Sequence, residues 1–250
     1  MFEKEIKHRN ITKVNLDVYD FLDFGCSSGG SLDYYAKIFN AKKGGLGIDK
    51  DPKKIVSARG SGHDVIQCDI TKLEVEGSVR FVVMSDFLEH IPDLKTVNFI
   101  IWRAVSIARE FVFIRQPYFD ADPYLFQLQL KFFWSDWEGH PNRMTTIEFH
   151  NIIKEIFNKG VIKRFSFYGH KKVKSSSDPS IHSIWSAKDQ HEWKKGEHPP
   201  KQLIHFGLDV FKQLAVVIDI NGESTKMIED RMPDMIKLYN SGAEMMKKRI

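Results

Sequence analysis

From residue 18 to residue 168, short apolar runs alternate with segments that have the spacing of amphipathic helices. The apolar runs lie at residues 19–25, 44–49, 63–70, 80–86, 111–117 and 161–169. Each run is nearly continuous, which is typical of strands buried on both faces of a parallel sheet. Two long helices are predicted at 94–108 and 145–158, the second capped by Thr145 or Thr146. This alternation predicts a doubly wound α/β fold with a mostly parallel sheet.

The chain is expected to divide into four segments. Residues 1–17 read as a polar lead-in with some helical character, and residues 18–169 as the α/β core. Residues 170–205 are rich in polar residues and histidine, which indicates an insertion, hairpin or long loop. Residues 206–250 are expected to hold a last strand at 214–220 and a C-terminal helix over 223–250.

Charge and cysteine content narrow the class of partner and the location. Lysine and arginine number 37 and aspartate and glutamate 33, so the net charge is only +4. This mild surplus, without a long basic block, disfavours a nucleic-acid partner. No apolar stretch approaches the roughly 20 residues of a membrane span, and the polar N-terminus lacks a signal-peptide core. The two cysteines, Cys26 and Cys68, are expected to be packing residues, so a cytoplasmic location is predicted.

A glycine-rich turn, DFGCSSGG, follows the first predicted strand at residues 23–30. Glycines at positions 25, 29 and 30 allow a ligand to approach the backbone, and the next helix offers free N–H groups at its start. In an open parallel sheet, the ligand crevice lies beyond the carboxyl ends of the strands. A plain tight turn is the alternative interpretation of the glycines alone.

Carboxylates accompany the ends of the next strands as well. Asp49 stands 24 residues after Gly25, an offset that suits the two hydroxyls of a ribose. Its alternative role is to cap the helix that begins near Pro52, although Asp51 is better placed for that. Asp69 follows the third strand, where it is either a solvated loop acid or a partner of an adenine amine. The segment SDFLEHIPD (85–93) follows the fourth strand, and acids at four successive strand ends are more specific than any one of them.

The order DxGxxxGG, GIDxD, CDI and SDFLEHIPD over residues 18–168 resembles the class I S-adenosylmethionine (SAM)-dependent methyltransferases with an EHIPD-like segment. The resemblance implies a Rossmann-like sheet of seven strands whose last strand is antiparallel, with SAM across the ends of strands one to four. It implies that Asp23 orients the loop and contacts the amino group of SAM, and that Asp49 binds the ribose. The other residues that it places around SAM are Gly25, Ser27, Gly29, Asp69, Ile70, Ser85 and Phe87.

Ser27 departs from the family, which usually has a glycine there, and a serine fits if its φ stays negative. The same departure weighs against an NAD(P)-dependent oxidoreductase, whose GxGxxG fingerprint would need glycine at position 27. Asp23, two residues before the turn, also suits a cationic amino group better than a pyrophosphate. A non-catalytic SAM-binding subunit is the second alternative.

The acceptor end of the site is less defined by sequence. His90 and His140 are candidate general bases, with a structural role as the alternative for each. The aromatic residues of segment 115–140 are expected both to pack on the core and to line an acceptor pocket; they are Tyr118, Tyr124, Phe133, Trp134 and Trp137. No metal site is expected, because the C-terminal histidines His182, His191, His198 and His205 lack a tight ligand pair.

Together these features predict methyl transfer from SAM to an oxygen, nitrogen or carbon nucleophile. The expected acceptor is a small molecule or a glycan- or lipid-linked precursor, and a homodimer is a possible assembly.

Overall fold

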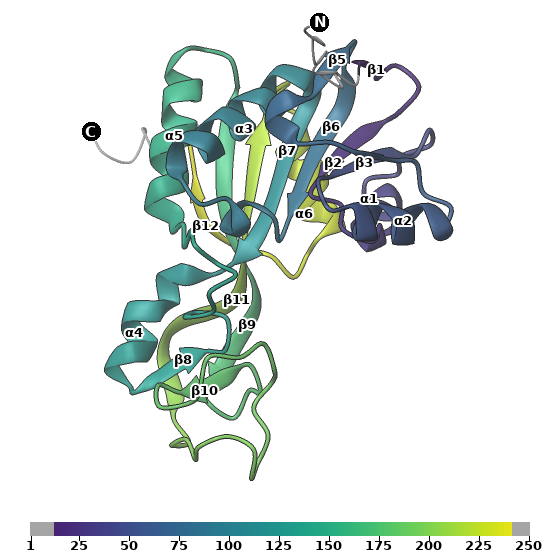
Figure 1. Ribbon diagram of the computed structural model, residues 1–250. Coiled ribbons are helices and arrows are strands. Elements are labelled where there is room, and N and C mark those ends of the chain that lie inside the picture. The colour runs from purple at the N-terminus through teal and green to yellow at the C-terminus, as the bar shows by residue number, and fades with distance from the viewer. Residues whose placement is uncertain (1–12, 242–250) are drawn as a thin grey trace, which may run out of the picture.

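The computed structural model describes residues 13–241, and within this range eight strands form the main sheet (Figure 1). Their order is β12-β9-β11-β7-β6-β2-β3-β4. From one edge to the other they span Ile236–Asn240, Arg164–Ser175, His205–Asp219, Ala108–Pro117, Val79–Ser85, Phe21–Phe24, Gly45–Asp49 and Val65–Gln67. Two further pairs lie outside this sheet: β1 (Lys13–Asn15) with β5 (Glu74–Glu76), and β8 (Leu130–Phe132) with β10 (Ile181–Ser183).

The strand directions confirm the α/β fold class. Strands β4, β3, β2, β6 and β7 pair in parallel, whereas β11 is antiparallel to both of its neighbours, β7 and β9. The last strand of the seven-stranded core is therefore antiparallel, as the resemblance implied. The described residues add an eighth strand, β12, which pairs antiparallel with β9 at the edge.

Helices cover both faces of the sheet because each strand presents apolar side chains in both directions. On β6, Val82 and Met84 pack with α3 (Leu94–Ile107) and α5 (Thr146–Asn158). Phe81 and Val83 face the other way, toward α1 (Gly30–Ile38), α2 (Pro52–Gly60) and α6 (Ser224–Arg231). The two apolar layers hold the sheet rigid, and its strand ends are therefore fixed positions for side chains.

Helix starts agree with the caps predicted from sequence. Asp51 caps α2 by accepting hydrogen bonds from the backbone N–H groups of Lys53 and Lys54. Thr145 caps α5 in a reciprocal capping box with Glu148. Because Asp51 caps α2, the carboxylate of Asp49 is left for other contacts.

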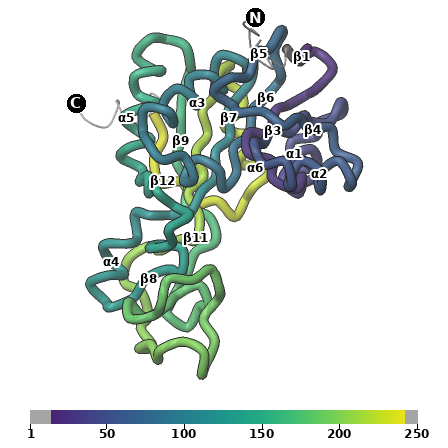
Figure 2. Tube along the Cα trace, viewed as in Figure 1, coloured from purple at the N-terminus to yellow at the C-terminus, as the bar shows by residue number. Residues whose placement is uncertain are grey.

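Strands β9 and β11 extend past the main sheet and carry a small lobe, seen below the sheet in Figures 1 and 2. The lobe consists of α4 (Asp122–Gln127), β8, β10 and the connecting segment 176–204, around an apolar cluster that includes Leu125, Phe132 and Val210. Of the alternatives for residues 170–205, a long loop does not describe residues 170–175, which continue β9 as one strand of an antiparallel hairpin with β11. Likewise, β11 begins at His205, not at residue 214.

The two chain ends differ from the sequence prediction where they are described. The predicted helix over 223–250 is correct for α6 but wrong for Ile236–Asn240, which form β12. Residues 242–250 and 1–12 lie outside the described residues. At the start, Lys13–Asn15 form strand β1, not a helix. No helix within residues 13–241 combines the length and the apolar character that crossing a membrane requires.

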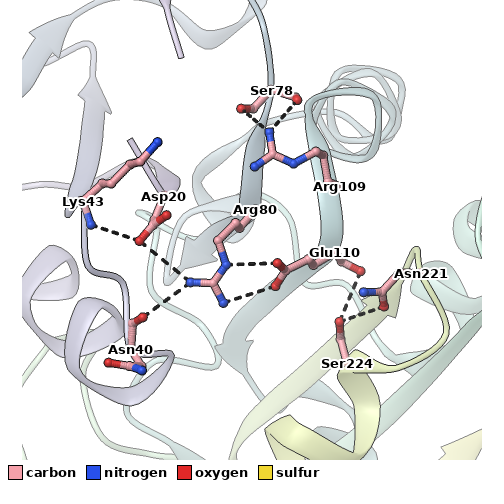
Figure 3. A network of polar contacts seen from close by, with 9 residues as sticks. All are labelled: Asp20, Asn40, Lys43, Ser78, Arg80, Arg109, Glu110, Asn221 and Ser224. Carbon is pink, nitrogen blue, oxygen red and sulfur yellow. Dashed lines mark hydrogen bonds and ion pairs between the residues drawn. The ribbon is translucent and has the colours of Figure 1, made fainter. Parts of the chain in front are cut away.

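A polar network links the amino-terminal ends of the parallel strands (Figure 3). Arg80 at the start of β6 makes a bidentate pair with Glu110 at the start of β7, with N–O distances of 3.0 and 3.3 Å. The same guanidinium lies 3.8 Å from the Asp20 carboxylate and donates to the carbonyl of Asn40. These contacts fix the starts of β6 and β7 and the end of α1 to one another. The carboxyl-terminal ends of the parallel strands lie on the opposite side of the sheet.

Candidate active site

A cleft of about 1060 Å³ lies beyond the carboxyl ends of β2, β3, β4 and β6. The chain builds β3 and β4 on one side of β2 and then returns to build β6 on its other side, so strand order reverses at β2. Open α/β sheets bind ligands at such a reversal. The loops that follow these strands line the cleft, and they contribute Ser27, Asp49, Asp69, Ile70 and Phe87 among others.

The glycine loop after β2 is shaped by packing against the protein's own side chains. Gly25 has φ +80°, and a Cβ added there would lie 2.3 Å from Cδ2 of Phe87. Gly29 has φ +96°, and its Cβ would lie 2.2 Å from Cδ2 of His63. Gly25 lines the cleft, as does Gly30, whose added Cβ would meet no atom of the described chain within 4 Å. Gly29 is not among the residues of the cleft wall, and its positive φ and close approach to His63 give it a role in the shape of the loop.

Ser27 adopts the left-handed backbone conformation with φ +51°. The condition for a serine at this position, a negative φ, is therefore not met. Its backbone N–H donates a hydrogen bond of 3.0 Å to Oδ2 of Asp49, while Oδ1 of Asp49 accepts from the backbone N–H of Asp51 at 2.9 Å. Asp49 thus holds two loops together from the end of β3, and its half-buried carboxylate also faces the cleft.

Asp23 lies inside β2 and is completely buried. Its Oδ2 accepts a hydrogen bond of 2.5 Å from the hydroxyl of Ser31, which lines the cleft, and its Oδ1 has no partner among the described residues. Burial raises the pKa of Asp23 to about 7; the nearby Asp49 adds to this rise, and Ser31 and Arg115 oppose it. A buried carboxylate oxygen with no partner is matched by a positively charged hydrogen-bond donor.

Asp69 and Ile70 stand together at the end of β4. Oδ1 of Asp69 accepts hydrogen bonds from the backbone N–H and the hydroxyl of Thr71, at 3.0 and 2.8 Å. Although partial burial acts to raise the pKa of Asp69, these bonds and the nearby Lys72 lower it overall. The Ile70 side chain is buried in the core and still forms part of the cleft wall. The pair offers an ionised acceptor beside an apolar surface.

Beyond β6, a chain of polar contacts leads to an arginine that sequence analysis did not identify. Ser85 accepts a hydrogen bond from Tyr35 and donates to Asp86 Oδ2, each at 3.3 Å. Arg115 in β7 donates to the same Asp86 oxygen at 3.2 Å, and its guanidinium lies 5.7 Å from the centre of the Tyr34 ring. Burial acts to lower the pKa of Arg115, but Tyr35 and Asp86 outweigh it and raise the pKa. The only sequence signal was one arginine inside the apolar run FVFIRQP.

The structure brings His90 and His140 together, with ring centroids 5.1 Å apart. His90 belongs to the short helix η2 (Leu88–His90), and its Nδ1 lies 2.7 Å from the carbonyl oxygen of Gly139. Nδ1 of His140 lies 3.2 Å from the carbonyl oxygen of Trp134. A carbonyl oxygen accepts, so each ring carries its proton on Nδ1 and leaves the lone pair of Nε2 free. Burial, reinforced by His90, lowers the pKa of His140 to about 4, which keeps that ring neutral.

Two smaller cavities adjoin the cleft on the side of the lobe. The first, of about 230 Å³, shares Asp86, His90 and Trp137 with the cleft and is also lined by His140. The second, of about 320 Å³, shares Phe133 and Trp134 with the first and reaches the lobe. The three spaces therefore adjoin one another through shared wall residues, with His90 and His140 in the wall of the middle one.

The predicted aromatic segment divides between cavity walls and core. Phe133, Trp134 and Trp137 line the smaller cavities. Tyr118 instead packs edge-on against Phe211, and the Tyr124 hydroxyl accepts a hydrogen bond of 2.9 Å from the backbone of residue 207. Segment 115–140 thus supplies residues both to the packed core and to the walls of the smaller cavities.

Residues 22–106, which include all the strand ends around the cleft, match the family model of a methyltransferase domain. The chain carries a class I SAM-dependent methyltransferase domain. No curated protein sequence matches it. As predicted, strands that pair antiparallel come after the parallel core in the chain of this methyltransferase; they are β9, β11 and β12.

Solved structures of SAM-dependent methyltransferases resemble this methyltransferase at low sequence identity. The enzyme from Archaeoglobus fulgidus is 13% identical, with a TM-score of 0.53 over 84% of this chain and 86% of that one, which shows a common fold. A possible histamine N-methyltransferase from Thermotoga maritima is 11% identical, with a TM-score of 0.47 over 81% and 82% of the two chains. Magnesium protoporphyrin IX methyltransferase from Synechocystis, with bound SAM, is 11% identical, with a TM-score of 0.42 over 80% and 70%.

The cofactor of the methyltransferase is SAM, and the cleft has the chemistry that SAM requires. SAM carries an ammonium, a carboxylate, a ribose diol and an adenine. The half-buried carboxylate of Asp49 lines the cleft and suits the diol. Asp23 does not itself line the cleft, but its unpartnered Oδ1, beside the cleft residue Ser31, suits an ammonium. The open backbone at Gly30, at the start of α1, leaves room for the carboxylate. The residues present therefore fit the cofactor, and the NAD(P) alternative is not supported.

Proposed function

We propose that this methyltransferase modifies an oxygen, nitrogen or carbon nucleophile of a small molecule or of a glycan- or lipid-linked precursor. One observation carries the proposal: the cofactor cleft and the adjoining 230 Å³ cavity share Asp86, His90 and Trp137. Side chains that belong to both spaces mark the place where donor and acceptor meet. Reacting groups held together in this way gain rate because they no longer have to find each other in solution.

The cofactor roles follow from the positions of the side chains. SAM supplies an activated methyl group on a sulfonium. Asp23 would accept from its ammonium and Asp49 from its ribose hydroxyls, while Asp69 and Ile70 would flank its adenine. The backbone from Gly25 to Gly30 would surround its methionine portion, and Ser85 and Phe87 would line the same side.

The cavity sizes favour an acceptor group of small-molecule dimensions. The spaces of about 230 and 320 Å³ share walls made by Phe133 and Trp134, and Trp137 also lines the first of them. Polar groups at the far end, Lys171 and Glu192, would interact with a polar part of the acceptor. A net charge of +4 offers little of the strong positive field expected for a nucleic-acid substrate.

His90 and His140 present free Nε2 lone pairs at this meeting place. An acceptor hydroxyl or amine must lose a proton on methylation. A positioned imidazole that takes this proton raises the rate by roughly 100- to 10,000-fold. His140 is neutral across the physiological pH range because its pKa is lowered to about 4, and a weak base of this kind acts chiefly by positioning. His90 is the more exposed of the two histidines and lines both the cofactor cleft and the 230 Å³ cavity.

The proposed acceptor class is tested by fractionation. An extract of the organism that encodes the protein is divided into small-molecule, lipid-linked, nucleic-acid and protein fractions, and each is incubated with SAM carrying a labelled methyl group. Label in the small-molecule or lipid-linked fraction supports the proposal, whereas label confined to nucleic acid or protein contradicts it. Phe133→Ala should raise the KM for that acceptor and leave the affinity for S-adenosylhomocysteine (SAH) unchanged, because Phe133 lines the smaller cavities and not the cleft.

A further inference from the structure

We propose that Glu89, His90 and His140 bind a divalent transition-metal ion at the junction of the cofactor cleft and the acceptor cavity. One carboxylate oxygen of Glu89 and one ring nitrogen of each histidine all lie within 4.8 Å of one another. Three ligand atoms at that spacing can close on a single ion with small side-chain movements. All three residues also line the 230 Å³ cavity.

Glu89 supplies an independent reason to place an ion here. Its side chain is 1% exposed, and Oε2 has no hydrogen-bond partner within residues 13–241. A buried carboxylate is stable only when it is paired, protonated or bound to a metal. Neither histidine Nε2 can donate to it, because each ring already has its proton on Nδ1. A cation between the carboxylate and the two lone pairs would satisfy all three groups together.

A backbone carbonyl fixes Nδ1 of each histidine. Nδ1 of His90 is fixed by the carbonyl of Gly139, and Nδ1 of His140 by the carbonyl of Trp134. Hydrogen bonds of this kind set the tautomer and aim the other ring nitrogen at a metal. In addition, the backbone N–H of Asn142 donates to the carbonyl of Glu89 at 3.2 Å, which joins the two chain segments that provide the ligands.

The donor set indicates the class of ion. Two imidazoles and one carboxylate suit Zn²⁺, Fe²⁺, Mn²⁺ or Co²⁺ better than Mg²⁺ or Ca²⁺, which prefer oxygen ligands. Three protein ligands leave coordination positions open toward the cavity, as in metal sites that bind a substrate. The side chain of Asp86, close by in the same wall, is engaged by Arg115.

The role of the ion rests on the proposed function. A hydroxyl of the acceptor that coordinates the ion becomes more acidic and releases its proton to bulk water. The oxygen lone pair then forms a bond to the methyl carbon while the carbon–sulfur bond breaks, and its electron pair stays on sulfur. His90 and His140 would act as ligands in this reaction and not as bases.

A second cluster, His182, Asp189 and His198, has similar spacing and does not have the same properties. Nδ1 of His198 accepts a hydrogen bond from the backbone N–H of Lys194 at 3.0 Å. The ring proton is therefore on Nε2, which lies 3.1 Å from Asp189 Oδ2 and donates to it. His198 has no lone pair left for a metal, so this cluster serves as the control.

Calorimetric titration of the chelator-treated full chain with Zn²⁺, and the visible absorption of its Co²⁺ form, test the proposal. We expect one site per chain, weakened by at least about 10-fold in Glu89→Gln and His140→Ala and unchanged in His198→Ala. If Glu89→Gln fails to fold, His90→Ala removes an exposed ligand and gives the same test. Absence of Zn²⁺ and Co²⁺ binding, or binding lost in His198→Ala and retained in Glu89→Gln, would overturn the proposal.

SAH binding measured on the same samples separates this proposal from the proposed function. Normal SAH affinity without metal binding would contradict the metal site and leave the methyltransferase assignment intact. Metal binding without SAH binding would contradict the functional proposal and leave the metal site intact.

Discussion

The backbone N–H of Ser27 donates a 3.0 Å hydrogen bond to the Asp49 carboxylate and so ties the glycine loop to the end of β3. Ser27 has a left-handed backbone conformation, and the bond holds it against the carboxylate of Asp49, which also faces the cleft. Loop shape and cofactor recognition therefore depend on the same carboxylate, and changes at either residue should affect both.

Ser27→Gly should stabilise the protein. A non-glycine residue with φ +51° carries a steric cost of about 1–2 kcal/mol, and glycine costs about 0.5–1 kcal/mol more chain entropy on folding. We expect a net gain of about 0.5–1 kcal/mol in the free energy of unfolding, measured by urea denaturation. Ser28→Gly, next in the chain and without positive φ, should be neutral or destabilising. Equal effects from the two substitutions would show that Ser27 is not strained.

Asp49→Asn should weaken SAH binding strongly. The substitution removes a charged acceptor, and hydrogen bonds to charged groups contribute about 1.5–3 kcal/mol each, so the dissociation constant should rise by about 10- to 100-fold. Asp51→Asn is the matched control, because Asp51 caps α2 and asparagine caps equally well. Calorimetry should find the Asp51 variant unchanged. Equal affinity for SAH in both variants would remove Asp49 from the ribose site.

Gly25→Ala should impair both folding and SAH binding. The new Cβ would lie 2.3 Å from the Phe87 ring, at a backbone φ of +80° that alanine adopts poorly. We expect a loss of about 2–4 kcal/mol in the free energy of unfolding. Phe87→Ala added to Gly25→Ala removes most of the clash and keeps the backbone strain. The double variant should therefore lose less stability than the sum of the losses in the two single variants. Strictly additive single losses would show that the two residues do not interact.

Asp23 should make the stability of the protein fall as the pH rises from about 4 to about 7, whereas His140, whose pKa is lowered to about 4 by burial, acts in the opposite direction. Asp23 has an ordinary pKa near 4 when unfolded and about 7 when folded, because burial favours its neutral form. In this window the folded state keeps a proton that the unfolded state has lost, so the free energy of unfolding falls by up to about 4 kcal/mol. In the metal-free protein, Glu89, with its pKa raised by burial to about 8, adds to the same trend.

Asp23→Asn provides the test of that pH dependence. Asparagine can still accept from the Ser31 hydroxyl but binds no proton, so denaturation curves between pH 4 and pH 7 should show a shallower fall than in the wild type. Parallel profiles for the two proteins would mean that Asp23 does not titrate in this range.

Most of the core fold is readable from the sequence because its signals are local. Strands buried on two faces are continuous apolar runs, and caps such as Asp51 and Thr145 mark helix starts directly. The start of β11 near residues 207–209 is exposed beyond the sheet, and its only apolar signal is the short alternation of Phe206, Leu208 and Val210. Strand β12 depends on pairing with β9, a contact that the helix-like spacing of its own residues does not reveal.

The candidate site was predictable where topology alone brings residues together. The acids Asp49 and Asp69 follow parallel strands, and the sheet places both at one cleft. The left-handed conformation of Ser27 depends on the distant Asp49 and could not be seen in its own residues. Arg115 and Glu89 were overlooked for a similar reason, since their partners lie on other segments of the chain.

Calorimetric titration of the wild-type protein with SAH, and separately with NAD, shows directly which cofactor the cleft binds. We expect one SAH bound per chain and no heat from NAD. Tight NAD binding with no response to SAH would contradict the assignment of the cleft to SAM.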